Sequence, residues 1–250
     1  MTRTTIQLRV RRQDRPTAAP RWEEFSIPYR PNSNVISCLM EIRKNPVTAD
    51  GRATTPVVWD SSCLEEVCGA CTMLVNGRPR QSCSALIDRL GDGPITLEPL
   101  SKFPVVRDLI VDRSPMFQAL KQVKAWIPID GTYDLGPGPR VSPETQEFGY
   151  ALSRCMTCGC CLEVCPQYND HSKFIGAAAM AQTVLFNMHP TGAMNKDERL
   201  EVIMGEGGIA DCGNAQNCVE VCPKEIPLTT AIGELGRQTT VKAVKDLLWR

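Results

Sequence analysis

Cysteines are the residues of this 250-residue sequence with the clearest capacity for chemistry: there are thirteen, and most fall into three groups of regular spacing. The first group has the spacing C-x4-C-x2-C with a fourth cysteine further on, and consists of Cys63, Cys68, Cys71 and Cys83. This is the spacing of plant-type [2Fe-2S] ferredoxins. Gly69 would let backbone N–H groups turn toward the sulfides of such a cluster. A zinc knuckle, the alternative, usually pairs C-x2-C with C-x2-C and matches less well.

The second group lies in "CMTCGCCLEVCP", residues 155–166, where nearly every second residue is a cysteine. It reproduces the bacterial ferredoxin run C-x2-C-x2-C-x3-C-P, whose fourth cysteine ligates the other cluster of a pair. The residues that fit the run are Cys155, Cys158, Cys161, Cys165 and Pro166. Cys160 falls outside this register, so we expect it not to be a ligand.

The third group, "CGNAQNCVEVCP" at residues 212–223, repeats the run with Ala215 where the second cysteine would stand. When the fourth ligands are crossed, one cluster receives a full [4Fe-4S] set, namely Cys155, Cys158, Cys161 and Cys222. The other cluster receives only Cys165, Cys212 and Cys218. Because a cubane iron without a ligand is readily lost, this set predicts [3Fe-4S]. A [4Fe-4S] cluster with Asn214 or Gln216 as the fourth ligand is the alternative.

The remaining cysteine and the two histidines have simpler interpretations. Cys38 shares an apolar helix face with Leu39 and Ile42, which predicts a small buried thiol. His171 and His189 are expected in surface or loop positions. A Rieske centre, which needs two histidine ligands, is excluded because the first group already supplies four thiolates.

Composition limits the classes of function. Lys plus Arg and Asp plus Glu both number 28, so no overall basic field would hold nucleic acid. Five arginines make the N-terminal strand locally basic, and we interpret them as a solvated strand face: Arg3, Arg9, Arg11, Arg12 and Arg15. The N-terminus has no secretory-type apolar run, which favours a reducing compartment with thiols available for metal. No apolar run approaches the roughly 20 residues that span a bilayer, so another chain would have to anchor this one to a membrane.

The pattern of apolar residues divides the chain into two predicted domains, residues 1–105 and 106–250. In the first, alternation predicts strands over residues 5–10 and 25–29, and Asn34 is placed to cap a helix that follows. Asn76-Gly77 is typical of a tight hairpin turn. These elements predict a small α+β unit around a half-open sheet.

The second predicted domain is helical. Apolar spacing predicts one helix with Phe117, Leu120, Val123 and Lys124 on one face. It predicts a second helix over residues 172–189, which must end before Pro190, and a third over residues 239–250. Ser142 and Pro143 are placed to start a further helix. The Pro- and Gly-rich stretch over residues 126–143 is expected to be an ordered surface loop.

At this point the sequence resembles a known family, the iron–sulfur subunits of succinate dehydrogenase and fumarate reductase. The resemblance covers nearly the whole chain and rests on "SSCLEEVCGACTMLVNGRPRQSC", "CMTCGCCLEVCP", "KFIGAAAM" and "NCVEVCPKEIPLTTAI". It implies an α+β protein with an N-terminal β-grasp [2Fe-2S] ferredoxin domain and a helical ferredoxin domain that carries [4Fe-4S] and [3Fe-4S] clusters. The stretches "RPNSNVISCLMEIR" and "VKAWIPIDGTYDLGPGPR" are most similar to the subgroup paired with a diheme cytochrome b subunit and menaquinone.

The resemblance also implies partners and a location. An FAD-containing flavoprotein would oxidise succinate in the tricarboxylic acid cycle, and this chain would pass single electrons to quinone as part of respiratory complex II. The chain would be a peripheral protein on the cytoplasmic face of a bacterial inner membrane, held by its membrane-anchor subunit. The same parts could run in reverse as quinol:fumarate reductase. A free polyferredoxin and a zinc-bound structural module are the alternatives of other classes.

Ubiquinone-using members of this family carry a tryptophan shortly after the C-x3-C-P run and a histidine directly after the first cysteine of the next run. This sequence has "CPQYNDHSKF" in the first place and Gly213 in the second, which favours menaquinone and a quinone site built mostly by the membrane subunit. The remaining candidates for contacts on the quinone side are Pro166, Tyr168, His171 and Lys173. The alternative is that the last three only line the subunit interface.

Overall fold

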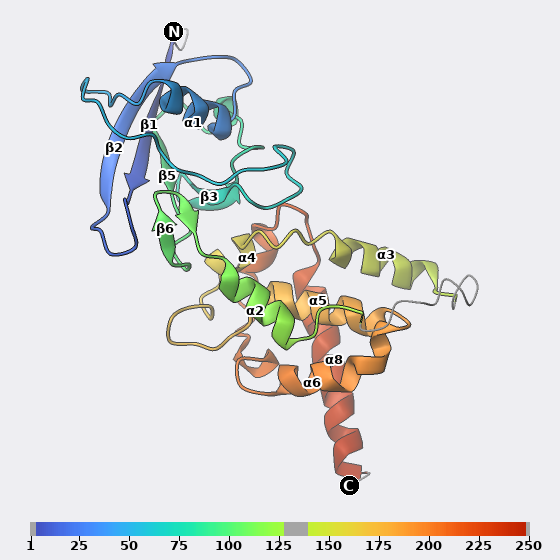
Figure 1. The fold of residues 1–250 in the computed structure, drawn as a ribbon. Helices are drawn as coiled ribbons and strands as arrows, with labels where there is room; N and C mark the ends of the chain where they lie inside the picture. The colour runs from blue at the N-terminus through green and yellow to red at the C-terminus, as the bar shows by residue number, and fades with distance from the viewer. Residues whose placement is uncertain (1–3, 128–139, 249–250) are drawn as a thin grey trace. The chain divides into compact units, whose positions relative to one another are not determined.

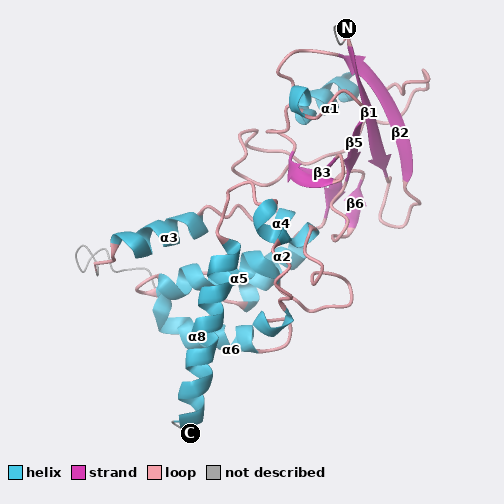
Figure 2. Cartoon of the chain, turned by 180° about the vertical axis from the view of Figure 1, so that it is seen from behind, coloured by secondary structure: helices cyan, strands magenta, loops and turns pink. Residues whose placement is uncertain are grey.

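The computed structural model describes residues 4–127 and 140–248 (Figures 1 and 2). Internal contacts divide the chain into two compact units. The first consists of Met1–Arg113 with Met156–Glu163, and the second of Ser114–Cys155 with Val164–Arg250. These units are defined by contacts within the chain, so the predicted domain boundary between residues 105 and 106 stays a prediction. The two units are described separately below.

The first unit is built on a five-stranded mixed sheet with the strand order β2-β1-β5-β3-β4. Its strands are β1 (Thr5–Arg12), β2 (Arg21–Pro28), β3 (Thr72–Val75), β4 (Arg78–Gln81) and β5 (Ile95–Glu98). β1 pairs antiparallel with β2 and parallel with β5, and β3 pairs antiparallel with β4 across the Asn76-Gly77 turn. Ile6, Leu8 and Val10 are buried on one face of β1, as alternation predicts. Both predicted strands and the hairpin are confirmed.

Helix α1 (Val35–Lys44) packs on this sheet (Figure 1). Asn34 caps it, since its side-chain oxygen accepts a hydrogen bond from the backbone N–H of Ser37 at 2.8 Å. Cys38 is buried in the core beside Leu39, so the prediction of a small buried thiol is confirmed. The unit is completed by four short elements: η1 (Ile87–Arg89), β6 (Val105–Arg107), β7 (Ile110–Val111) and α4 (Cys160–Glu163).

A buried charge network ties the end of β1 to the chain that leads into the first cysteine group. Arg12 has no exposed surface, which corrects the prediction that it lies on a solvated face. Its guanidinium bonds Glu23 (Nη1 to Oε2, 2.6 Å) and Asp108 (Nε to Oδ1, 3.0 Å). The remaining N–H groups reach Thr55 O, Thr55 Oγ1 and Pro56 O. Residue 12 has the same parity along the strand as the core residues of β1, so its side chain points inward.

The second unit is helical, with α2 (Ser114–Gln122), α3 (Pro143–Ser153), α5 (Gly176–Met188), η3 (Gly192–Asn195), α6 (Lys196–Met204), η4 (Ile209–Asp211), α7 (Asn217–Glu220) and α8 (Leu228–Leu248). α5 is the central helix and contacts α2, α3, α6 and α8 (Figure 2). It is rich in alanine and buried almost all round, which allows its neighbours to approach closely. Among the described residues, no helix is both long and apolar enough to cross a bilayer.

Several helix ends differ from prediction for identifiable reasons. α2 ends at Gln122 because Lys124 has a left-handed backbone (φ 47°), and Phe117 is exposed while Met116 and Ala119 are buried. α5 begins at Gly176 rather than residue 172, although it ends before Pro190 as expected. α8 begins at Leu228, well before the predicted residue 239.

Two further predictions concern segments that the structure describes only in part. Ser142 caps α3, as predicted, by accepting a hydrogen bond from the backbone N–H of Thr145. The loop predicted over residues 126–143 lies mostly within residues 128–139, outside the described residues, as do residues 249–250 of the predicted C-terminal helix.

Candidate metal centres

The first cysteine group lies on one loop and the hairpin that follows it. Cys63 and Cys68 are in the loop, Cys71 directly precedes β3, and Cys83 follows β4. Leu64, Glu66 and Gly69 have left-handed backbones (φ 61°, 58° and 71°), which bend the loop tightly. This bend turns successive N–H groups toward sulfur.

Backbone donors converge on the sulfur of Cys63. The N–H groups of Glu65, Val67 and Cys68 donate to it at 3.4, 3.3 and 3.3 Å. These bonds lower the pKa of the Cys63 thiol to about 7, because they stabilise the thiolate. The thiolate is the form that binds metal, so this loop fits an iron–sulfur cluster.

The other two cysteines of this group, Cys71 and Cys83, are buried. Burial, together with the nearby thiol of Cys83, raises the pKa of Cys71 to about 12. A thiolate in such surroundings needs a positive partner, which the irons of a cluster supply. Ser82, between Gln81 and Cys83, is also fully buried, and its Oγ is the buried side-chain oxygen without a hydrogen-bond partner in the described part of the chain. A free hydroxyl donor next to a predicted ligand fits a site with sulfide acceptors.

Part of the second group, Cys158 to Cys161, belongs to the first unit. Cys160 is fully buried, and a hydrogen bond with its side chain is the main cause that lowers the pKa of Cys158 to about 7. The charge of Arg113 lowers it as well. A Cβ atom on Gly69 would lie 2.8 Å from Met156 O, so the two cysteine loops approach each other backbone to backbone.

The second and third groups share one backbone pattern. Two residues after the first cysteine, Thr157 and Asn214 have φ values of 51° and 50°. Four residues after it, Gly159 and Gln216 have φ values of 91° and 64°. Five residues after it, the short helices α4 and α7 begin. Ala215 therefore occupies the backbone position that Cys158 has in the second group, which supports the register of the predicted ligands.

The predicted [3Fe-4S] ligands lie around one small cavity of the second unit. Cys165, Cys212 and Cys218 all line it, together with Ala215. Burial raises the pKa of Cys218, and the neighbouring thiols of Cys165 and Cys212 raise it further. Asn214 and Gln216, the alternative fourth ligands, line the same cavity. The structure thus brings the three thiols and both alternatives together.

The predicted [4Fe-4S] set stays a prediction, since its members are divided between the two units. Cys158 and Cys161 belong to the first unit, and Cys155 and Cys222 to the second. The Cys222 sulfur accepts a hydrogen bond from the N–H of Ile226 at 3.5 Å. None of the thirteen cysteines, all of which are described, forms a disulfide. Over residues 4–127 and 140–248, no group of three or more His, Cys, Asp or Glu side chains is arranged to hold a single metal ion.

The candidates for quinone contacts differ in position. Pro166 lines the cavity at the [3Fe-4S] ligands, whereas Tyr168, His171 and Lys173 are not among its lining residues. His171 lies in an exposed turn, and Lys173 forms an exposed ion pair with Glu206 at 2.7 Å.

Gln167 is a cavity residue that the sequence analysis missed. A Cβ atom on Gly213 would lie 2.6 Å from its Nε2 atom, so the Gln167 amide occupies the space that a side chain at position 213 would need. The glycine directly after Cys212 is the signal in the sequence that could have indicated this.

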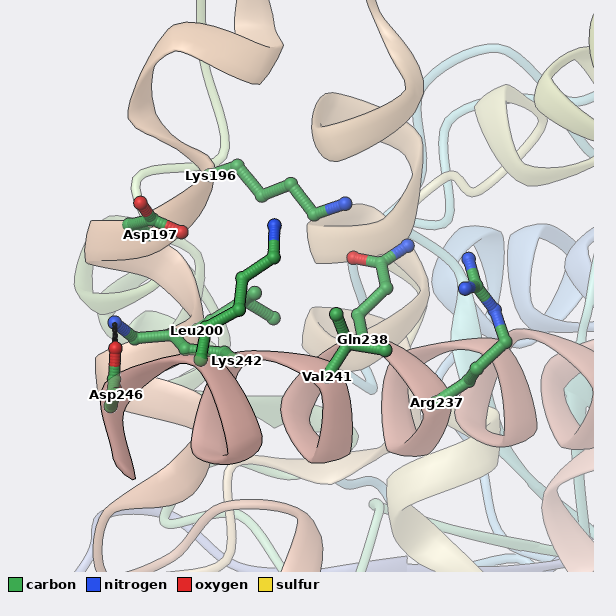
Figure 3. Close-up of a pocket in the computed structure, with 9 residues that line it drawn as sticks. Lys196, Asp197, Leu200, Arg237, Gln238, Val241, Lys242 and Asp246 are labelled. Carbon is green, nitrogen blue, oxygen red and sulfur yellow. Dashed lines mark hydrogen bonds and ion pairs between the residues drawn. The ribbon is translucent and has the colours of Figure 1, made fainter. Parts of the chain in front are cut away.

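A second cavity, of about 410 Å³, lies between α6 and α8 and contains no cysteine (Figure 3). Its lining mixes both charge signs, and two of its cations already have partners. Lys242 pairs with Asp246 at 3.2 Å, and Arg237 pairs with Glu234 at 2.7 Å. We therefore assign no ligand to it.

Two successive units with ferredoxin-type cysteine loops define the class of this protein, an iron–sulfur protein with more than one cluster. Two family models match in the same order: a 2Fe-2S iron–sulfur cluster binding domain over residues 7–118, and a 4Fe-4S dicluster domain over residues 151–226. The fold class that the motifs predict is thereby confirmed.

Comparison with individual proteins narrows the class to a family. The chain is 64% identical to the succinate dehydrogenase iron–sulfur subunit of Bacillus subtilis, over 97% of this chain and 95% of that protein. It is 32% identical to the fumarate reductase iron–sulfur subunit of Wolinella succinogenes, over 93% and 96%. A chain of the Mycobacterium smegmatis Sdh1 complex has a TM-score of 0.81 at 25% identity, covering 96% of this chain and 98% of that one. The chain belongs to the family of succinate dehydrogenase and fumarate reductase iron–sulfur subunits.

Proposed function

We propose that this chain is the electron-transfer subunit of a membrane-bound succinate:quinone oxidoreductase. The observation that carries the proposal is the succession of three cysteine groups on two ferredoxin-type units, in a chain 64% identical to a succinate dehydrogenase iron–sulfur subunit over nearly its whole length. Dicarboxylate chemistry belongs to an FAD-containing flavoprotein partner. This sequence has no G-x-G-x-x-G dinucleotide fingerprint of its own.

The chain contributes ligands, hydrogen bonds and burial. The proposed [2Fe-2S] ligands are Cys63, Cys68, Cys71 and Cys83, the [4Fe-4S] ligands are Cys155, Cys158, Cys161 and Cys222, and the [3Fe-4S] ligands are Cys165, Cys212 and Cys218. When bound, each cluster accepts and releases one electron at a time. N–H donors such as those around Cys63 stabilise negative charge on the ligand sulfurs, and the buried side chains exclude water from the cluster sites.

The finer parts of the proposal concern the electron acceptor. We propose a diheme cytochrome b anchor subunit, menaquinone as the acceptor, and a peripheral position on the cytoplasmic face of a bacterial inner membrane. The sequence around the [3Fe-4S] ligands supports this, because it lacks the tryptophan and the histidine of ubiquinone-using relatives. Gln167 fills the space beside Gly213 with an amide instead.

Low-temperature electron paramagnetic resonance (EPR) with iron and sulfide analysis of the purified complex tests the proposal. We expect signals of all three cluster types. Each ligand Cys→Ser variant should then perturb one named cluster, and a colourless, iron-free protein would refute the proposal.

The second candidate function is the reverse reaction, quinol:fumarate reduction. The 32% identity to the Wolinella fumarate reductase subunit supports this candidate. Comparison of succinate oxidation with quinol-driven fumarate reduction in one preparation separates the two directions. A free polyferredoxin would instead be stable and active without partner subunits.

A further inference from the structure

A single buried amide joins the two cysteine loops of the first unit. Gln81, the last residue of β4, has no exposed surface. Its Oε1 lies 3.6 Å from the sulfur of Cys71, a proposed [2Fe-2S] ligand. Its Nε2 lies 2.7 Å from Thr72 Oγ1 and 3.9 Å from the sulfur of Cys160. The side chain therefore contacts a proposed ligand at one end and the buried thiol outside the ligand register at the other.

The donors and acceptors of this arrangement suit a thiol at Cys71 but not a metal ligand. With a proton on sulfur, Cys71 donates to the amide oxygen of Gln81. A cluster ligand is a thiolate without that proton, so a lone pair on sulfur would face a lone pair on oxygen with no hydrogen between them. A buried contact of that kind is unfavourable.

Rotation of the Gln81 amide by 180° removes the conflict. The N–H group then donates to the Cys71 thiolate, and the amide oxygen accepts a hydrogen bond from the hydroxyl of Thr72. In the structure, before any rotation, the Thr72 hydroxyl donates to Gly69 O at 2.8 Å. That carbonyl keeps a partner after the rotation, because Arg113 Nη1 donates to it at 2.7 Å. The amide, the Thr72 hydroxyl and Gly69 O therefore all keep hydrogen-bond partners.

We propose that Gln81 is a positioning residue that donates an N–H hydrogen bond to the Cys71 thiolate and is itself held by the hydroxyl of Thr72. A hydrogen bond to a ligand sulfur stabilises the reduced cluster, which carries one more negative charge, and so raises the reduction potential. Cys160 lies against this amide without being a ligand. This inference rests on the proposed [2Fe-2S] ligand set.

The test replaces Gln81 in the assembled complex and follows the [2Fe-2S] cluster by an EPR-monitored redox titration. Gln81→Leu removes the N–H donor, and Gln81→Glu keeps the shape but places a carboxylate at the same point. Both variants should have a lower [2Fe-2S] midpoint potential than the wild type, and Gln81→Glu the lower of the two. Gln7→Leu is the matched control, since Gln7 lies on exposed β1 surface and bonds only Ser26 Oγ by its side chain among the described contacts; its potential should be unchanged.

A second measurement uses the wild-type complex and does not depend on how the variants fold. Glutamine labelled with ¹⁵N in the side-chain amide should give a hyperfine coupling to the reduced [2Fe-2S] cluster, and Gln81→Glu should abolish it. Absence of this coupling in the wild type, or an unchanged potential in a fully loaded Gln81→Leu complex, overturns the inference. Absence of any [2Fe-2S] signal in the wild type would instead refute the proposed function.

Discussion

Replacement of Arg12 by methionine should destabilise the first unit strongly. Arg12 lies at the end of β1, about 50 residues before the first cysteine group. Methionine keeps much of the volume of the side chain but removes the guanidinium. Glu23 and Asp108, 6% and 0% exposed, would then keep their charges without the buried partner that compensates them. The carbonyls of Thr55 and Pro56 would lose donors as well.

The size of the effect follows from the burial of the pair. Removal of one partner from a buried ion pair costs about 3–5 kcal/mol, because the other charge stays buried. With about 1.4 kcal/mol per factor of ten, amides of β1 that exchange by opening of the unit should exchange about 150- to 4,000-fold faster. Hydrogen–deuterium exchange with mass spectrometry, read on peptides of β1 and of residues 54–58, measures this directly. Loss of the visible absorbance of the [2Fe-2S] cluster on heating should accelerate in parallel.

Arg9→Met is the matched control on the same strand. Arg9 is about half exposed, pairs with Glu24 at 3.9 Å and lies 4.6 Å from the ring centre of Trp22. Its loss should cost about 1 kcal/mol, or roughly fivefold in exchange. Addition of Glu23→Gln to Arg12→Met should recover part of the loss, since it removes a buried carboxylate that keeps only the partly exposed Arg21 as its ion-pair partner. Equal effects of Arg12→Met and Arg9→Met would refute the reasoning.

Three further predictions concern the cluster ligands and the quinone side. Ala215→Cys should supply the missing thiolate, convert [3Fe-4S] to [4Fe-4S], lower its potential and slow quinone reduction; an oxidised-state [3Fe-4S] EPR signal that persists unchanged would count against the register. Cys38→Ser and Cys160→Ser should leave the iron content intact, and loss of the [4Fe-4S] signal in Cys160→Ser alone would identify Cys160 as a ligand. His171→Ala should change quinone reduction less than threefold, under about 0.7 kcal/mol of barrier. A hundredfold loss with all three clusters intact would make His171 a main quinone contact.

The sequence predicted those parts of the fold that depend on neighbouring residues. Alternation placed Ile6, Leu8 and Val10 on a buried strand face, and the Asn34 cap and the Asn76-Gly77 turn are local devices. The parallel pairing of β1 with β5 joins segments about 90 residues apart, and no local pattern specifies it. The prediction of an exposed Arg12 was wrong for a different reason. It rested on the charge of the residue, although the alternation along β1 places residue 12 on the buried face.

The site divides in a similar way. Cysteine spacing sufficed to propose ligands and registers, because each loop must wrap its own cluster from a short stretch of chain. It could not reveal Gln81, Ser82 or Gln167, whose surroundings depend on residues brought together by the fold. Exposed apolar residues of the helical unit were also unpredictable from periodicity. Phe117 is 54% exposed although apolar spacing placed it on one face with Leu120 and Val123.

The loop around Ala215 has the same backbone pattern as the second cysteine group but a different set of proposed ligands. Its left-handed residues are Asn214 and Gln216, where the second cysteine group has Thr157 and Gly159. Asparagine adopts this conformation readily, but glutamine at φ 64° is strained by about 1–2 kcal/mol relative to glycine. Such strain persists only where the surroundings impose it, and it concentrates at functional sites. The loop is therefore held in the shape of a cluster-binding run even though one thiolate is missing, so the number of irons should depend on the side chain at position 215 rather than on the path of the chain.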